Sequence, residues 1–277
     1  ADPYLQQMLF TGRASSKLGV NQENLYKPIV SIVKDINVSN AQMESLKGVS
    51  ETYRDFYSKP SFYKDQKLAL FDLFLLANHA KERNKYIKDK NDKDSGSGIS
   101  DIEADAILNW FNTLNNNQIN KFRDAQSLIK KVVDNTNLAR QESGLQKKFT
   151  PDEATGFVNY VPLRHNKELK EELAADLAGE PQVGMNNLYG ARGKLDQTLQ
   201  GRENLPFDIM ANVFVQNQNS LQKGERNKVG NSFAKMLLEV DEQNNSLNGT
   251  RIGTIIKQKD PMNEDHNNRV LTIKADQ

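Results

Sequence analysis

Apolar residues recur at the spacing of an α-helix over three long stretches, and this feature constrains the fold most. The stretches cover residues 62–90, 100–143 with an interruption at 115–117, and 206–240. An apolar residue at every third or fourth position gives a helix one apolar face, which must be buried against another element. At 1.5 Å per residue the last helix would be roughly 50 Å long. The sequence therefore predicts a mainly α fold, an elongated helical bundle with long helices.

Two shorter helical segments precede the long ones, and the period of the pattern changes near the end of the chain. Residues 22–37 have helical spacing with Pro28 near the first turn, where proline is tolerated, and residues 41–58 form a weaker helix that Pro60 ends. The later segments "TRIGTIIKQ" and "NRVLTIKA" have the residue types of β-strands. We therefore expect a small C-terminal β-hairpin or sheet.

The chain divides into four expected segments. Residues 1–178 form a helical domain with helix-turn-helix packing, and 179–202 form a loop or linker rich in glycine. Residues 203–248 form a long helix that packs on the first domain, and 249–277 form a β element that continues into a missing domain. The chain has no initiator Met and ends abruptly, so we expect a piece of a longer polypeptide.

Composition excludes several classes of function. The chain has 37 Lys and Arg against 36 Asp and Glu, a net charge of +1, and a protein dedicated to coating nucleic acid would be more basic. The absence of cysteine excludes disulfides, thiolate metal sites and cysteine nucleophiles. No apolar run approaches about 18 residues, so no membrane span is expected. No residue pattern implies a cofactor.

A cluster of polar residues ends the apolar stripe of the helix over 62–90. The sequence "LLANHAKERN" places His79, Glu82, Arg83 and Asn84 on or beside that stripe, and "SGSG" follows at 95–98. Positions three and four apart share one helix face, so the cluster faces the core. The glycines allow the chain to reverse closely past this helix.

Two interpretations of this cluster remain open. His79 with Glu82 and Asn78 could bind a metal ion, and only Asp101 and Glu103 are near enough in sequence to complete the site. We favour a polar clasp, in which Glu82 and Arg83 bind each other or buried backbone groups and His79 makes one hydrogen bond. The candidate residues for this clasp or site are His79, Glu82, Arg83, Asn84, Ser100 and Glu103.

Ser100 and Glu103 have the spacing of a capping box at the start of the next helix, with Ser100 at the N-cap and Glu103 reaching back. A separate group of basic residues could contact phosphates; its members are Arg202, Lys223, Arg226 and Lys228. The intervening Glu225 and the balanced total charge favour a solvated face instead. Neither "SGSG" nor "GARGK" matches a P-loop, and no Ser–His–Asp pattern is present, so we assign no catalytic residue.

Several segments, in this order, resemble the large polyvalent proteins of bacteriophages, which join enzymatic and accessory domains in one chain. They are "NHAKERN", "SGSGISDIEA", "YVPLR", "QGRENLPFDIMANVFVQNQNSLQKGERNKVGNSF" and the strand pair, and together they cover about residues 65–275. The motif is of the Pro-Leu-x-Arg type and includes Tyr160, Pro162, Leu163 and Arg164. Here Arg164 follows Leu163 directly, whereas the family pattern has the arginine one place later with Phe-Gly after it.

The resemblance implies an internal virion protein that is delivered into the host cell with the DNA, or a protein made early to protect that DNA. Its location would be the virion interior and then the host cell. Its partners would be other virion proteins or further domains of the same polypeptide, and DNA binding by this segment would be weak. The alternative is an accessory segment of a multidomain phage enzyme, such as a virion RNA polymerase, a DNA-modifying or antirestriction enzyme, or a peptidoglycan hydrolase. An enzyme segment would have its polar cluster unpaired in an open pocket.

Overall fold

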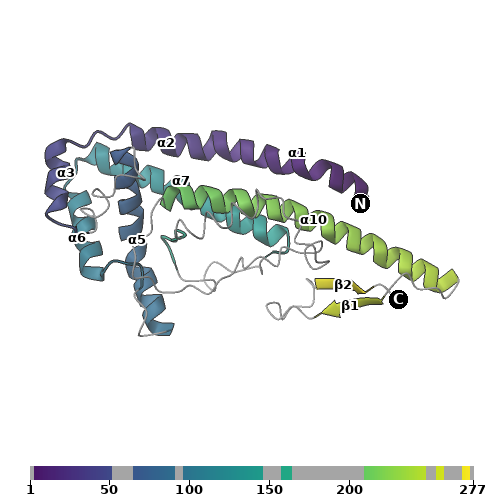
Figure 1. Cartoon of the computed structure of the whole chain (residues 1–277). Coiled ribbons are helices and arrows are strands. Elements are labelled where there is room, and N and C mark those ends of the chain that lie inside the picture. Colours follow the sequence, from purple (N-terminus) through teal and green to yellow (C-terminus); the bar gives the residue numbers. More distant parts are fainter. Residues whose placement is uncertain are drawn as a thin grey trace.

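The structure is a computed structural model that describes residues 3–51, 65–90, 96–145, 157–163, 209–247, 254–258 and 270–274. Helices dominate these residues, so the predicted mainly α class is confirmed. Figure 1 shows the long helices α1, α7 and α10 side by side, with α3, α5 and α6 gathered at one end. The helices are α1 (Pro3–Asn21), η1 (Gln22–Tyr26), α2 (Lys27–Lys34), α3 (Asn40–Lys47), α5 (Gln66–Lys90), α6 (Asp101–Asn112), α7 (Asn116–Glu142) and α10 (Ile209–Leu247).

The first helical segment is longer than expected and contains one wide turn. α1 and α2 are joined by η1, a π-helical turn in which the Lys27 N–H donates to the Gln22 carbonyl. Pro28 explains its position, because proline has no N–H and its ring clashes with the carbonyl four residues earlier. The predicted helix over 22–37 is therefore η1 and α2, which ends at Lys34.

The second predicted helix, over 41–58, is interrupted after Lys47 in the structure, and its part over 52–58 lies outside the described residues. α3 begins at a complete capping box formed by Ser39 and Gln42 and ends at Lys47, with Gly48 as its C-cap. A turn follows over 48–49, and Glu51 is helical again. Glycine and the turn after it stop the helix because glycine is a poor helix former; residues 52–64 lie outside the described ranges.

The predicted interruption at 115–117 is where one helix ends and the next begins. α6 ends at Asn112, and Asn115 forms a capping box with Gln118 at the start of α7. Asparagine suits an N-cap because its side-chain oxygen accepts from a backbone N–H that the helix leaves free. This short connection sets α7 against α2 and α10.

An apolar core fills one part of the bundle. α5 is buried on every side from Ala69 to Ala77, as expected for a helix at the centre of a helical protein. Phenylalanines from three helices meet there: the Phe74 ring lies 4.9 Å from that of Phe111 and 5.5 Å from that of Phe122. Aromatic contacts of this kind add stability beyond the apolar area they bury.

The apolar core does not extend along the whole bundle. Its last described members are Val133 in α7 and Val213, with the partly buried Phe214, in α10, and it includes none of the described side chains of α1. Beyond these positions, among the side chains that the structure describes, the buried residues of α7, its C-cap and α10 are mainly polar: Thr136, Arg140, Ser143, Asn217, Ser220 and Glu225, with Leu221 as the apolar exception. The described bundle therefore has an apolar half and a polar half.

Two short strands follow α10 in the chain. β1 (Thr254–Gln258) pairs antiparallel with β2 (Val270–Lys274), with Ile256 opposite Thr272 (Figure 1). α10 packs against α1 and α7. The predicted loop over 179–202 lies outside the described residues, and the division into four segments and the continuation into a further domain stay predictions.

Candidate functional site

The predicted polar cluster lies on the last turns of α5, where the helix leaves the apolar core. His79 is completely buried and Arg83 is 2% exposed, while Glu82 and Asn84 are half-buried. The helical spacing of three and four residues puts these side chains on neighbouring parts of one face. Each then meets a different segment of the chain.

Asn84 binds the turn that leads into α6. Its amide nitrogen donates to the Ile99 carbonyl (2.9 Å) and to the Asp101 carboxylate (2.7 Å). Its side-chain oxygen accepts from the Ser97 N–H at 2.7 Å. A Cβ atom at Gly96 would lie 2.1 Å from that same oxygen, so the close approach requires glycine.

Arg83 binds the same turn from the buried side. Its Nε donates to the Gly96 carbonyl at 3.3 Å. Gly98 has a φ of 95°, a conformation that side chains with a Cβ rarely adopt. Glycine is therefore required at position 96 because a Cβ would clash, and it is favoured at position 98 because of the positive φ.

The predicted capping box at α6 forms in one direction. Ser100 Oγ accepts from the Glu103 N–H at 3.1 Å, as an N-cap residue does. The Glu103 carboxylate accepts from Ser50 Oγ at 2.9 Å. It therefore links the start of α6 to the turn after α3, a contact that the capping interpretation missed.

Glu82 binds a segment far away in the chain. Its carboxylate accepts from the Asn159 backbone N–H (3.1 Å) and lies 3.4 Å from the Asn159 amide nitrogen. This contact fixes the segment over 157–163 on α5. The segment contains most of the phage-type motif: Pro162 and Leu163 are buried, Tyr160 is half-buried, and Arg164 lies outside the described residues.

His79 is enclosed by rings instead of hydrogen-bond partners. Its ring centroid lies 5.2 Å from that of Phe157 and 5.5 Å from that of Tyr160, both in edge-to-face contact. Within the described ranges neither ring nitrogen has a hydrogen-bond partner, and Nδ1 is 3.9 Å from a Glu82 oxygen, too far for a hydrogen bond. The expectation that His79 makes one hydrogen bond is therefore wrong, because aromatic edges occupy the space that a partner needs.

Burial acts on the protonation of both members of this pair, and polar contacts decide its outcome for Glu82. Burial has the larger effect on His79. It lowers the pKa of His79 below its ordinary value, and nearby Arg83 lowers it further, while Glu82 acts in the opposite direction. Burial alone would raise the pKa of Glu82. The His79 side chain and the backbone N–H groups of Asn159 and Val158 outweigh that effect and lower it. At neutral pH the cluster therefore holds a neutral imidazole and a charged carboxylate.

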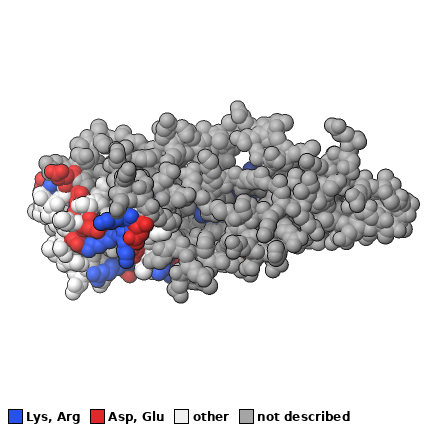
Figure 2. Space-filling model, turned by 90° about the horizontal axis from the view of Figure 1, so that it is seen from below, with Lys and Arg blue, Asp and Glu red and all other residues white. Residues whose placement is uncertain are grey.

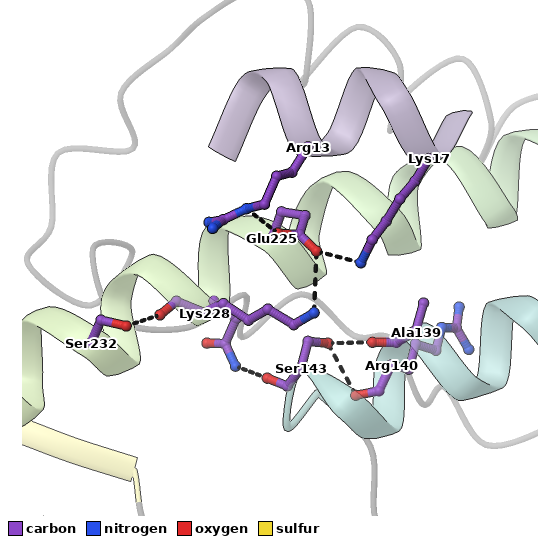
Figure 3. A network of polar contacts seen from close by, with 9 residues as sticks. Arg13, Lys17, Ala139, Arg140, Ser143, Glu225, Lys228 and Ser232 are labelled. Carbon is purple, nitrogen blue, oxygen red and sulfur yellow. Dashed lines mark hydrogen bonds and ion pairs between the residues drawn. The ribbon is translucent and has the colours of Figure 1, made fainter. Parts of the chain in front are cut away.

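The basic residues considered for phosphate binding differ in exposure and in their partners. Lys228 Nζ lies 3.2 Å from the carboxylate of Glu225, which is only 3% exposed (Figure 3). Arg226 is exposed, Lys223 is half-buried, and Arg202 lies outside the described residues. The prediction that Glu225 belongs to a solvated face is wrong, because α1 packs on this side of α10.

Asp72 is a further polar residue that the sequence interpretation missed. It is buried in α5, and its two carboxylate oxygens accept from the backbone N–H groups of Ile209 (2.8 Å) and Met210 (3.0 Å). The charge thus caps the positive end of α10 from another helix. An aspartate inside the apolar run "ALFDLFLL" was the available signal, because a buried charge needs a partner.

The described residues offer no site of another common kind. Among them no three His, Asp or Glu side chains are grouped as metal ligands. No helix in the described ranges has the length and apolar character to cross a membrane. Figure 2 shows Lys and Arg lying beside Asp and Glu at the end of the molecule that holds α3, α5 and α6, where Lys81 pairs with Asp105 at 2.5 Å.

Comparisons of this chain with protein-family models, with curated proteins and with solved structures found no match.

Proposed function

We propose that this chain is a noncatalytic helical module of a large phage protein, packaged in the virion and delivered into the host cell with the DNA. The observation that carries the noncatalytic part is the closure of the polar cluster on α5. Glu82, Arg83 and Asn84 bind backbone groups of two other segments, and aromatic rings enclose His79. A catalytic group must reach its substrate, and an imidazole with 0% exposure does not.

The phage assignment rests on the resemblance of the ordered segments from "NHAKERN" to the strand pair. Within this proposal the β-hairpin after residue 249 connects the helical bundle to a further domain of the same polypeptide. Other virion proteins are the remaining partners. The clasp then has a mechanical role, because it joins α5 to the turn before α6 and to the segment over 157–163.

Composition supports delivery through a narrow passage. The chain has no cysteine, so it can unfold and refold without thiol chemistry. Polar residues fill much of the half of the bundle that contains α1, which limits the apolar surface exposed during unfolding.

Mass spectrometry of purified particles tests location. Peptides from residues 96–145 should be present in intact particles of the encoding phage and depleted from particles that have released their DNA, while shell proteins remain. Absence from intact particles, with the same peptides abundant in infected cells, would overturn delivery and favour the enzyme-linked alternative.

A variant tests the noncatalytic part separately. His79→Phe should fit the ring-lined space and remove the titratable group without abolishing infectivity. Arg83→Ala, in contrast, should weaken the clasp. If the His79→Phe protein folds and enters particles normally but infection fails at a defined chemical step, the cluster has a catalytic role and the proposal is wrong.

A further inference from the structure

The helix α1 is attached to the bundle without contributing to its apolar core. Among the described side chains of α1, Ala14 is a buried apolar residue, but it does not belong to the core cluster. Of its larger apolar residues, Leu5, Met8, Leu9 and Val20 are exposed, Met8 by 79%, while Phe10 and Leu18 are partly buried. Burial of apolar area is the main force that holds helices together in water, so α1 is held weakly by that force.

Charge holds α1 to α10 instead. Arg13 Nε lies 3.0 Å and Lys17 Nζ 2.7 Å from the two carboxylate oxygens of Glu225 (Figure 3). Lys228 approaches the same carboxylate from within α10. Arg13 and Lys17 are 33% and 41% exposed, so water and salt weaken these two contacts.

A polar layer marks where this weak attachment begins. The Asn217 side-chain oxygen accepts from Asn21 (2.8 Å) and from the Tyr26 hydroxyl (2.5 Å), and its nitrogen donates to Thr136 Oγ1 at 2.8 Å. Tyr26 also stacks on Phe214 with ring centroids 4.0 Å apart. The layer lies at the boundary between the polar and apolar halves.

The π-turn η1 adjoins this polar layer, because Tyr26 is its last residue. Single π-turns interrupt the regular hydrogen bonding of a helix and are common at functional positions. On one side of η1 lies α1, and on the other lies α2, whose Ile29 and Val33 are completely buried in the core. A bend at η1 would therefore move α1 while α2 stays in place.

We propose that α1 is a hinged arm that docks on α10 reversibly, with Glu225 as its latch and η1 as its hinge. Docking brings Arg13 and Lys17 onto Glu225, and release opens the polar half of α10 without unfolding the apolar half. This conformational device does not depend on the proposed phage function.

Hydrogen exchange of individual amides tests the arm. In the unaltered chain the α1 amides should exchange faster than those of α2 and α5. They should still exchange more slowly than the amides of a helix that packs against no other element. Raising the salt concentration to about 1 M, where the screening length is about 3 Å, should speed α1 selectively. Glu225→Gln should speed it by roughly tenfold and leave α5 unchanged.

A matched control removes a charge pair elsewhere. Asp35 pairs with Lys121 of α7 just after α2, so Asp35→Asn should leave α1 exchange unchanged. If Glu225→Gln does not fold, Lys17→Gln on α1 and the salt series on the unaltered chain give the same comparison. Exchange of α1 only at the rate of global unfolding, or no protection of α1 at all, would overturn the proposal.

Discussion

At position 79 a titratable ring occupies a completely buried space between aromatic edges, which makes stability depend on pH. Burial lowers the pKa of the His79 imidazole below its ordinary value of 6.5. The unfolded chain therefore binds a proton more readily than the folded chain. The contribution of neutral His79 is fully present above that ordinary value and is lost as pH falls below it, by at most about 1.4 kcal/mol per pH unit.

Denaturant unfolding at pH 8 and at pH 5 checks this prediction. The unaltered chain should lose more stability between these values than His79→Phe, because only the former takes up the proton at this position on unfolding. The pKa of Glu82 is lowered from 4.5, so its contribution falls away below that value and does not confuse the comparison. Identical pH dependence of the two proteins would contradict the prediction.

Sequence periodicity placed His79, Glu82 and Arg83 on the buried side of α5, and the structure agrees. It did not supply their partners. Glu82 binds Asn159, 77 residues later, and no local pattern encodes a contact over that distance. Asn84 binds Ser97, which is only 13 residues later in the sequence, so its partner is much more local.

At the scale of elements, the connection between α5 and α6 depends on the lack of a side chain at Gly96. A Cβ there would lie 2.1 Å from Asn84 Oδ1 and 2.6 Å from its Cα, so the turn must shift away from α5. Gly96→Ala should lower the free energy of unfolding by about 3 kcal/mol, the upper end for overpacking. Gly48→Ala is the matched control, since its Cβ would lie 3.5 Å from the nearest atom. Equal melting of the two variants would contradict the steric argument.

The start of α10 depends on a charge supplied by α5. Asp72→Ala removes the carboxylate that accepts from Ile209 and Met210 and should destabilise the chain by about 1–2 kcal/mol, as loss of a helix cap does. Asp105→Ala, which removes an exposed ion pair with Lys81, should change stability little. Thermal melting of both variants checks the difference, and a larger loss for Asp105→Ala would show that the buried cap contributes little.

The elements that sequence predicted best have both a periodic core face and a local start signal. α6 and α7 follow the N-cap residues Ser100 and Asn115. The N-cap role of Ser100 was predicted, whereas Asn115 was predicted only to interrupt the helix. α1 was not predicted, because four of its large apolar residues, Leu5, Met8, Leu9 and Val20, face solvent and its pattern gives no core stripe. Its position is set by Glu225 on α10, which sequence alone placed on a solvated face.

At the scale of the whole molecule, the two halves of the bundle differ in whether the burial of their residues could be predicted from sequence. The apolar half follows from residue type, because Phe71, Phe74 and their neighbours must be buried somewhere. The polar half does not, since Asn217, Glu225 and Arg140 are buried only where α1, α7 and α10 come together. Helical class could therefore be predicted, whereas the placement of α1 required the assembled fold.

The balance of charge over the whole chain predicts weak binding to duplex DNA. Net charge is +1, and three of the basic residues in the polar half, Arg13, Lys17 and Lys228, are already held by Glu225. Affinity for duplex DNA comes chiefly from an excess of cations that displace counterions from phosphates, and a net charge of +1 provides little such excess. A fluorescence titration at about 0.15 M salt should show no saturable binding, and Arg226→Ala should behave like the unaltered chain. Tight binding that weakens steeply with salt and is reduced in Arg226→Ala would instead identify the exposed side of α10 as a phosphate-binding surface.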